Sequence, residues 1–214
     1  MFLAYFPPGS GFDNVNRRFL FTLTNKSPFE FHMEQSKSWY GHLEAPLREL
    51  QAGEGKDMGV LQIRGYKKAD TATGATHSLC FRIATPAGKL NAWLNIYLQV
   101  GYTANNYFGW FISDTSQCLE PQTWYQSTNF NEKKGSCSDR VLNIGGSNRL
   151  TANCFGFLPI TMYTDNMSWS TPSMSITWNS LISRHSDFWL NYTLAYNSQH
   201  HDRKIPYIVS NKLS

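Results

Sequence analysis

The sequence predicts an all-β fold, an antiparallel β-sandwich with one or two short helices. Of the 214 residues, 15% are aromatic and only 16% are charged, a balance typical of β-rich chains. Short strand-like runs alternate with turns rich in Gly, Pro and Asn. The clearest run, "LNAWLNIYLQV" from Leu90 to Val100, alternates apolar and polar residues without a break. We expect Leu94, Ile96, Leu98 and Val100 to point into one core, because alternate residues share a sheet face.

The elements follow one another along the chain with recognisable turn signals between them. The expected strands begin near Phe2, Arg17, Phe29, Met58, His77, Leu90, Tyr107, Arg140, Ala152 and Met174. Two segments favour a short helix, Glu44 to Gln51 and Gln122 to Thr128. No repeat divides the chain, so we expect one sandwich domain over residues 1–182 and a polar C-terminal extension over residues 183–214.

Charge and hydropathy exclude some partners. The net charge of +4 is mildly basic, but the basic residues form no run longer than a doublet, so we expect no nucleic-acid partner. No apolar run reaches the roughly 18 to 20 residues that a membrane-spanning helix needs. The opening "MFLAYFPPGSG" lacks the basic leader and long apolar core of a secretory signal. We nevertheless expect a secreted protein, or one associated with a target membrane.

The four cysteines are Cys80, Cys118, Cys137 and Cys154, and none forms a CxxC pair, so their spacing predicts no zinc site. The last three lie in turn-rich sequence, and we expect one disulfide among them. Cys80 lies in an apolar strand, where a buried thiol is expected. Three Asn-x-Ser/Thr triplets, at Asn25, Asn166 and Asn191, are compatible with secretion but also arise by chance in a chain rich in Asn.

The usual catalytic motifs are missing. The sequence contains no GxSxG, no HExxH and no Walker-type glycine-rich loop. The segment His200-His201-Asp202 offers metal ligands, but a doublet in a terminal tail is more often solvated. We therefore expect no enzyme activity, no metal and no cofactor.

One stretch, "VGYTANNYFGWF" from Val100 to Phe111, sets several aromatic rings beside asparagines and glycines. Here the alternation ends, and we expect an aromatic loop with exposed rings. A quaternary ammonium cannot donate a hydrogen bond, so the faces of Tyr and Trp rings hold it best. Such amphipathic rings also sit well at the headgroup level of a bilayer.

The order of several landmarks resembles the actinoporins and the wider group of cytolysins and fungal fruit-body lectins. The matching residues are Asn25-Lys26-Ser27, Trp39-Tyr40-Gly41, Pro46 to Gly53, Ala72-Thr73-Gly74-Ala75, and the pattern V-x-Y-x-x-N-x-Y-x-x-W that ends at Trp110. The likeness covers roughly residues 17–178. It implies a β-sandwich that binds the phosphocholine headgroup of sphingomyelin and forms oligomers on membranes. The implied headgroup site consists of Tyr102, Asn105, Tyr107, Trp110 and Tyr125.

Pore formation and two other functions remain open. Actinoporins insert an N-terminal helix, but Pro7, Pro8 and Gly9 forbid a continuous helix at this position, so membrane binding is better supported than a pore. The opening "FLAYFPPG" resembles a strand and turn of picornavirus-like jelly-roll capsid proteins, which would place the chain in a virion. A lectin on the same sandwich is the third option, in which Tyr and Trp stack on sugars and Asn105 or Asn106 bind hydroxyls.

Overall fold

The computed structural model describes residues 11–27, 29–45, 50, 59–85, 88–103, 106–113, 116–126, 137–142, 148–154, 158–165, 167 and 169–177. The chain divides into two compact units, Met1–Trp178 and Asn179–Ser214. All described residues belong to the first unit, and the fold below is that of this unit alone. The predicted boundary after residue 182 lies outside the described residues and stays a prediction.

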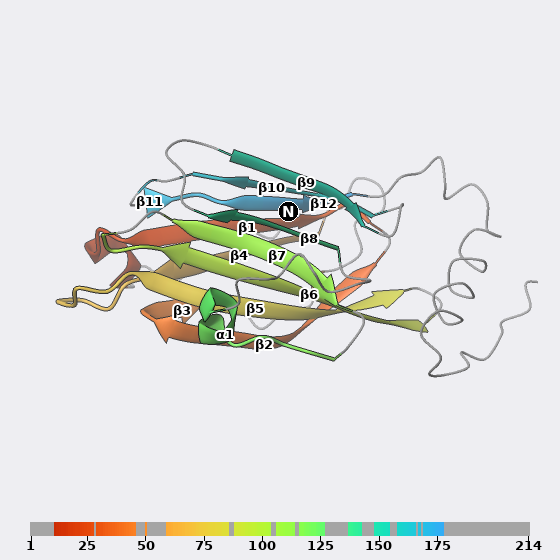
Figure 1. Ribbon diagram of the computed structural model, residues 1–214, viewed down its shortest axis with the longest axis horizontal. Coiled ribbons are helices and arrows are strands. Elements are labelled where there is room, and N and C mark those ends of the chain that lie inside the picture. Colours follow the sequence, from red (N-terminus) through yellow and green to blue (C-terminus); the bar gives the residue numbers. More distant parts are fainter. Residues whose placement is uncertain are drawn as a thin grey trace, which may run out of the picture. The chain divides into compact units, whose positions relative to one another are not determined.

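The first unit is a β-sandwich of two sheets, which confirms the predicted fold class (Figure 1). Sheet A has the order β3 (His42–Glu44), β4 (Gly59–Tyr66), β1 (Arg18–Asn25), β12 (Ser173–Ile176), β10 (Leu158–Thr164) and β9 (Asn148–Cys154), and β11 (Trp169–Ser170) also pairs with β1. Sheet B has the order β2 (Glu30–Tyr40), β5 (Ala75–Thr85), β6 (Gly88–Val100), β7 (Tyr107–Ser113) and β8 (Cys137–Leu142). Pairing is antiparallel except where β1 runs parallel to β11 and β12.

One of the two predicted helices is present among the described residues. The α1 helix (Pro121–Gln126) lies at the expected place, and a single 3-10 turn, η1 (Gly11–Asn14), precedes β1. The helix expected from Glu44 to Gln51 is wrong, because both of its ends pair with strands. Glu44 is paired with Arg64 in β4, and Leu50 exchanges two main-chain hydrogen bonds with Phe31. The long strand-like run at Ala152 is a hairpin, in which β9 pairs with β10.

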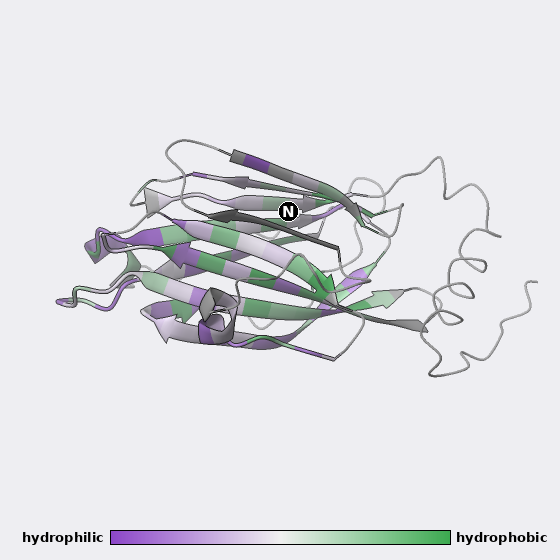
Figure 2. Ribbon diagram, in the orientation of Figure 1, coloured by the Kyte–Doolittle hydropathy of each residue, from purple (hydrophilic) through white to green (hydrophobic). Residues whose placement is uncertain are grey.

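The sandwich core confirms the predicted alternation in β6. Leu94, Ile96, Leu98 and Val100 are fully buried. Sheet A contributes the other half of the core, chiefly Phe19, Phe21, Leu23, Ile63, Ile160, Met162 and Ile176. Figure 2 shows hydrophobic residues recurring along the strands, while the loops at the left of the view carry hydrophilic ones.

The outer face of sheet B is covered as well. We call residues 116–126 the strap. The strap ends in α1, and α1 contacts β2 and β5. Leu119 and Trp124 of the strap are buried in one cluster with Tyr97, Tyr107 and Phe111 of the sheet. Residues of β6 and β7 are therefore buried on both faces of sheet B.

The disulfides differ from the expectation at Cys80. Cys80 is bonded to Cys118, so Cys80 is not a free thiol. The side chain of Cys80 points to the outer face of β5, where the strap brings Cys118 against it. Cys154 is disulfide-bonded as well. Sequence could not show this pairing, because it depends on the strap folding back across the sheet.

The first Asn-x-Ser triplet serves the fold. Asn25 is fully buried at the end of β1. Its side-chain amide donates to the carbonyl of Phe29 at 2.6 Å, and its oxygen accepts from the main-chain N–H of Ser27 at 3.0 Å. An amide held in this way is closed to glycosylation in the folded protein, so the triplet at Asn25 is a structural turn.

Candidate functional site

Tyr107 and Trp110 lie in a strand and not in an exposed loop. They are three residues apart in β7, and an odd spacing places side chains on opposite faces of a sheet. Trp110 is only 1% exposed between the two sheets, and its indole N–H finds no acceptor among the described residues. Tyr107 is 6% exposed under the strap, with its ring centroid 5.0 Å from that of Tyr97. The predicted cage that contains both rings is therefore wrong.

The other three predicted site residues differ in how much the structure describes of them. Asn105 lies outside the described residues. Tyr125 is part of α1, and its side chain also lies outside the described part of the structure. Tyr102, in the loop between β6 and β7, is 39% exposed and is the one predicted ring that the structure shows at the surface.

Tyr102 belongs to a group of neighbouring loops that we call the loop end. It consists of the β2–β3 turn at Gly41 and the described residues of the β4–β5 loop (67–74), the β6–β7 loop (101–106) and the β10–β11 loop (165–168). In Figure 1 the β4–β5 loop extends to the far left of the sandwich. Loops at one end of a sandwich are a common place for binding residues, because the strands hold them rigidly.

Two glycines allow these loops to approach one another. Gly41 has a φ of +86°, and a Cβ at this position would lie 2.2 Å from the main-chain oxygen of Tyr66. A Cβ at Gly74 would lie 2.2 Å from the main-chain oxygen of Val100. These residues are the glycines of the Trp39-Tyr40-Gly41 and Thr-Gly-Ala landmarks. The landmarks thus mark close contacts between loops.

Asn106 joins the two sheets at the loop end. It is 5% exposed, and its amide nitrogen donates to the carbonyls of Asp165 at 3.1 Å and Met167 at 2.9 Å. These bonds hold the β6–β7 loop of sheet B against the β10–β11 loop of sheet A. The Asp165 carboxylate in turn accepts from the main-chain N–H groups of Met167 and Thr171, at 3.0 and 2.9 Å.

The ammonium group of Lys67 lies over the exposed ring of Tyr102. The Lys67 ammonium lies 5.5 Å from the centroid of the Tyr102 ring. It also donates a hydrogen bond to the carbonyl of Thr71 at 3.2 Å, which fixes its position. In the sequence, Lys67 is only half of the basic doublet Lys67-Lys68, because its pairing with a ring across two loops has no local signal.

Two further apolar side chains are exposed at the loop end. Tyr40, at the end of β2, is 42% exposed and stacks on Trp39, and Met167 is 64% exposed. Aromatic rings and thioethers beside ammonium groups form a surface that suits an interface between water and lipid. Tyr40 belongs to a landmark noted in the sequence, whereas Met167 carried no signal.

The described residues hold no group of three or more His, Cys, Asp or Glu side chains arranged to bind a metal ion. In the same part of the chain, no helix is both long enough and apolar enough to cross a bilayer.

Comparisons with known proteins show similarity of fold. No protein-family model matches the chain, and no curated protein matches it in sequence. The crystal structure of the lipid-binding protein Nakanori is similar with a TM-score of 0.52 and 12% identity, over 76% of this chain and 72% of Nakanori. The crystal structure of the RahU protein in complex with a Tris molecule gives a TM-score of 0.37 and 9% identity, over 77% of this chain and 98% of RahU.

Proposed function

We propose that the protein binds lipid headgroups at a membrane surface through the loop end, with choline lipids such as sphingomyelin as the preferred ligands. The observation that carries the proposal is the exposed Tyr102 with the Lys67 ammonium over its ring. Nearby loops add the exposed side chains of Tyr40 and Met167. One end of the sandwich therefore offers rings, a thioether and a cation together.

A phosphocholine headgroup matches these side chains. Its phosphate carries a negative charge that the Lys67 ammonium attracts. Its quaternary ammonium is stabilised by a tyrosine face by about 0.5 to 2 kcal/mol, and the exposed rings of Tyr102 and Tyr40 can supply one. Met167 is suited to contact the acyl boundary below the headgroups.

Further support comes from the fold, which Nakanori, a lipid-binding protein, shares. The disulfide between Cys80 and Cys118 fits an oxidising compartment, so we place the protein outside the cell or on a target membrane. We propose a binding protein and not an enzyme. Oligomerisation on the membrane and pore formation belong to the same proposal, and the N-terminal residues 1–10 that bear on a pore lie outside the described part.

The first experiment is co-sedimentation with vesicles that contain sphingomyelin, compared with vesicles that lack choline lipids. We expect Tyr102→Ala to weaken binding by about 1 to 2 kcal/mol, or roughly five- to thirty-fold, and Tyr102→Phe to keep part of the affinity because a ring face remains. Lys67→Gln should weaken binding most at low salt, since the phosphate attraction is screened by ions.

Val60→Ala is the matched control, because Val60 is 41% exposed but lies near the start of β4, at the opposite end of the strand from Tyr66. Its affinity should equal that of the unchanged protein. If the unchanged protein sediments with neither type of vesicle, the lipid proposal fails and the lectin and capsid alternatives take its place. Equal losses in the Tyr102→Ala and Val60→Ala variants would move the site away from the loop end.

A further inference from the structure

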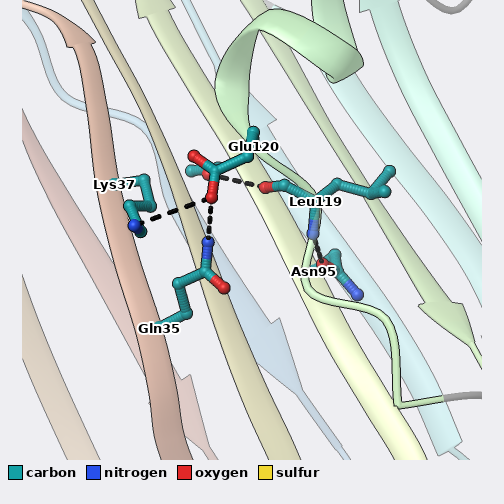
Figure 3. A network of polar contacts seen from close by, with 6 residues as sticks. Gln35, Lys37, Asn95, Leu119 and Glu120 are labelled. Atoms are coloured by element: carbon teal, nitrogen blue, oxygen red, sulfur yellow. Dashed lines mark hydrogen bonds and ion pairs between the residues drawn. The ribbon is translucent and has the colours of Figure 1, made fainter.

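The strap is held to the outer face of sheet B by side chains. Residues 116–120 form neither strand nor helix, and polar groups from three strands hold them (Figure 3). Asn95 of β6 donates to the carbonyl of Gln117 at 3.0 Å and accepts from the N–H of Leu119 at 3.0 Å. The Ser78 hydroxyl of β5 donates to the carbonyl of Leu119 at 2.8 Å.

A second set of contacts holds the strap at the edge of the sheet. The Glu120 carboxylate accepts from the Gln35 amide at 3.0 Å and lies 3.7 Å from the Lys37 ammonium. Figure 3 shows Gln35 and Lys37 reaching Glu120 from the same strand, β2. Both charged side chains are about half exposed, and exposed ion pairs stabilise a structure little. These contacts alone hold the strap weakly.

The only covalent link between the strap and the sheet among the described residues is the bond between Cys80 and Cys118. It lies between the Asn95 contacts to Gln117 and Leu119, so it anchors the centre of the polar segment. Cys80 is buried in β5, but Cys118 on the strap is only half-buried. Cys118 is therefore the partly exposed member of the pair.

What the strap covers is strongly apolar. Beneath it lie the rings of Tyr97, Tyr107 and Phe111. The centroid of the Trp124 ring is 5.1 Å from that of Phe111 and 5.6 Å from that of Tyr97. The α1 helix that carries Trp124 has six residues, too few for a stable helix on its own. Its position therefore depends on the anchors of the strap and on this one aromatic contact surface.

We propose that the disulfide between Cys80 and Cys118 is a redox-operated latch that keeps the strap closed over the aromatic face of sheet B. A thiolate of a dithiol reductant attacks the sulfur of Cys118 and displaces the Cys80 thiolate, which takes up a proton. The second thiol of the reductant then displaces Cys118 and closes the reductant's own disulfide. Two electrons and two protons leave two thiols on the protein. The strap is then held only by the side-chain contacts described above, those of Asn95, Ser78, Glu120 and Trp124, and it opens to expose the rings beneath.

Hydrogen exchange measures this opening directly. The N–H of Leu119, bonded to Asn95, and that of Trp124, bonded to the Glu120 carbonyl at 3.1 Å, report on the two halves of the strap. In a Cys80→Ala/Cys118→Ala double variant, we expect both amides to exchange at least about tenfold faster at neutral pH, while amides of β1 keep their rates. A dye that binds apolar surface should also bind more strongly to the variant.

The second anchor gives a matched control. Asn95→Ala removes the acceptor of the Leu119 amide, so the Trp124 amide is the readout for this variant. Exchange of the Trp124 amide should change little while the disulfide is intact, and much more in the double variant, because each anchor compensates for loss of the other. If the double variant does not fold, the same amides are measured in the unchanged protein after dithiol reduction. Strap amides that exchange as slowly without the disulfide as with it would overturn the proposal. An equal increase in the exchange rates of strap and β1 amides would also overturn the proposal, because it would mean that the whole sandwich is destabilised.

Discussion

At the scale of single residues, three buried asparagines shape this protein. Asn25, Asn95 and Asn106 are each at most 5% exposed, and each bonds two main-chain groups of a neighbouring loop. An amide can do this because it carries two donor hydrogens and an acceptor oxygen. In the sequence, an abundance of Asn indicates loops, glycosylation or sugar contacts. The structural role of a buried asparagine becomes visible only when the segments that it bonds, such as residues 117–119 and 165–167, are known.

His77 leads to a prediction about pH. Its ring is fully buried between the sheets, near the Phe19 ring, and its Nδ1 hydrogen-bonds with the Ser38 hydroxyl at 2.9 Å. Burial, with the nearby His42, lowers the pKa of His77 from 6.5 to about 3. Between these two values the unfolded chain binds a proton that the folded protein does not. Stability should therefore fall as the pH drops below 6.5, by about 1.4 kcal/mol per pH unit from this group, and level off near pH 3.

Denaturant unfolding at pH 7.5 and pH 4.5 measures the effect. A His77→Gln variant, which keeps a polar side chain but cannot titrate in this range, should lose the His77 part of the difference between the two pH values. The same difference in the variant and in the unchanged protein would show that other groups cause the acid sensitivity.

At the scale of elements, β7 shows why an aromatic sequence pattern was mistaken for a loop. Six residues from Tyr107 to Ile112 are all buried, so the strand has no polar face to reveal its period. Strands buried on both sides lack alternation. Here the second cover is the strap, which follows β7 in the chain and returns across the sheet. The sequence showed that aromatic rings gather here, but it could not show that a second apolar layer covers them.

Replacing Trp110 or Tyr107 of β7 with alanine should lower the stability of the fold or of the strap. Trp110→Ala removes a large side chain from the sandwich core, and we expect a loss of about 3 to 5 kcal/mol in the free energy of unfolding. Tyr107→Ala removes a ring from the layer under the strap and should mainly speed amide exchange in residues 117–124. Thermal melting and hydrogen exchange separate the two results. A Trp110→Ala protein that melts normally but no longer binds vesicles would restore this ring to the binding site.

At the scale of the whole molecule, sequence predicted the sandwich more fully than the site. Period-2 alternation located most strands, because it records which side chains face a core. It failed at Glu44 and Leu50, whose strand-like pairing is set by distant partners. It also failed for Lys67 and Met167, since the loop end is assembled from residues about a hundred positions apart. The exposure of Tyr102 could be predicted, because a ring beside Gly and Asn has a local signature.

The order of strands in sheet A makes a final prediction about where the chain can be shortened. The last strand among the described residues, β12, lies between β1 and β10, so it joins the two halves of the sheet. The carbonyl of Ile176 accepts from the N–H of Lys26 at 2.7 Å, and the N–H of Thr177 donates to the carbonyl of Pro159 at 2.9 Å. A chain ending at the predicted boundary, residue 182, keeps all of these contacts and should retain its melting temperature.

A chain ending after Thr171 loses β12, with the buried Met174 and Ile176, and exposes main-chain groups of both neighbouring strands. Buried strand groups without partners are costly, so this chain should show no cooperative melting transition. Circular dichroism during heating distinguishes the two chains. If the protein ending at residue 182 also fails to melt cooperatively, the sandwich needs residues beyond 182, and the predicted division into domain and extension is wrong. If the shorter chain melts like the full protein, β12 does not join sheet A as the structure describes.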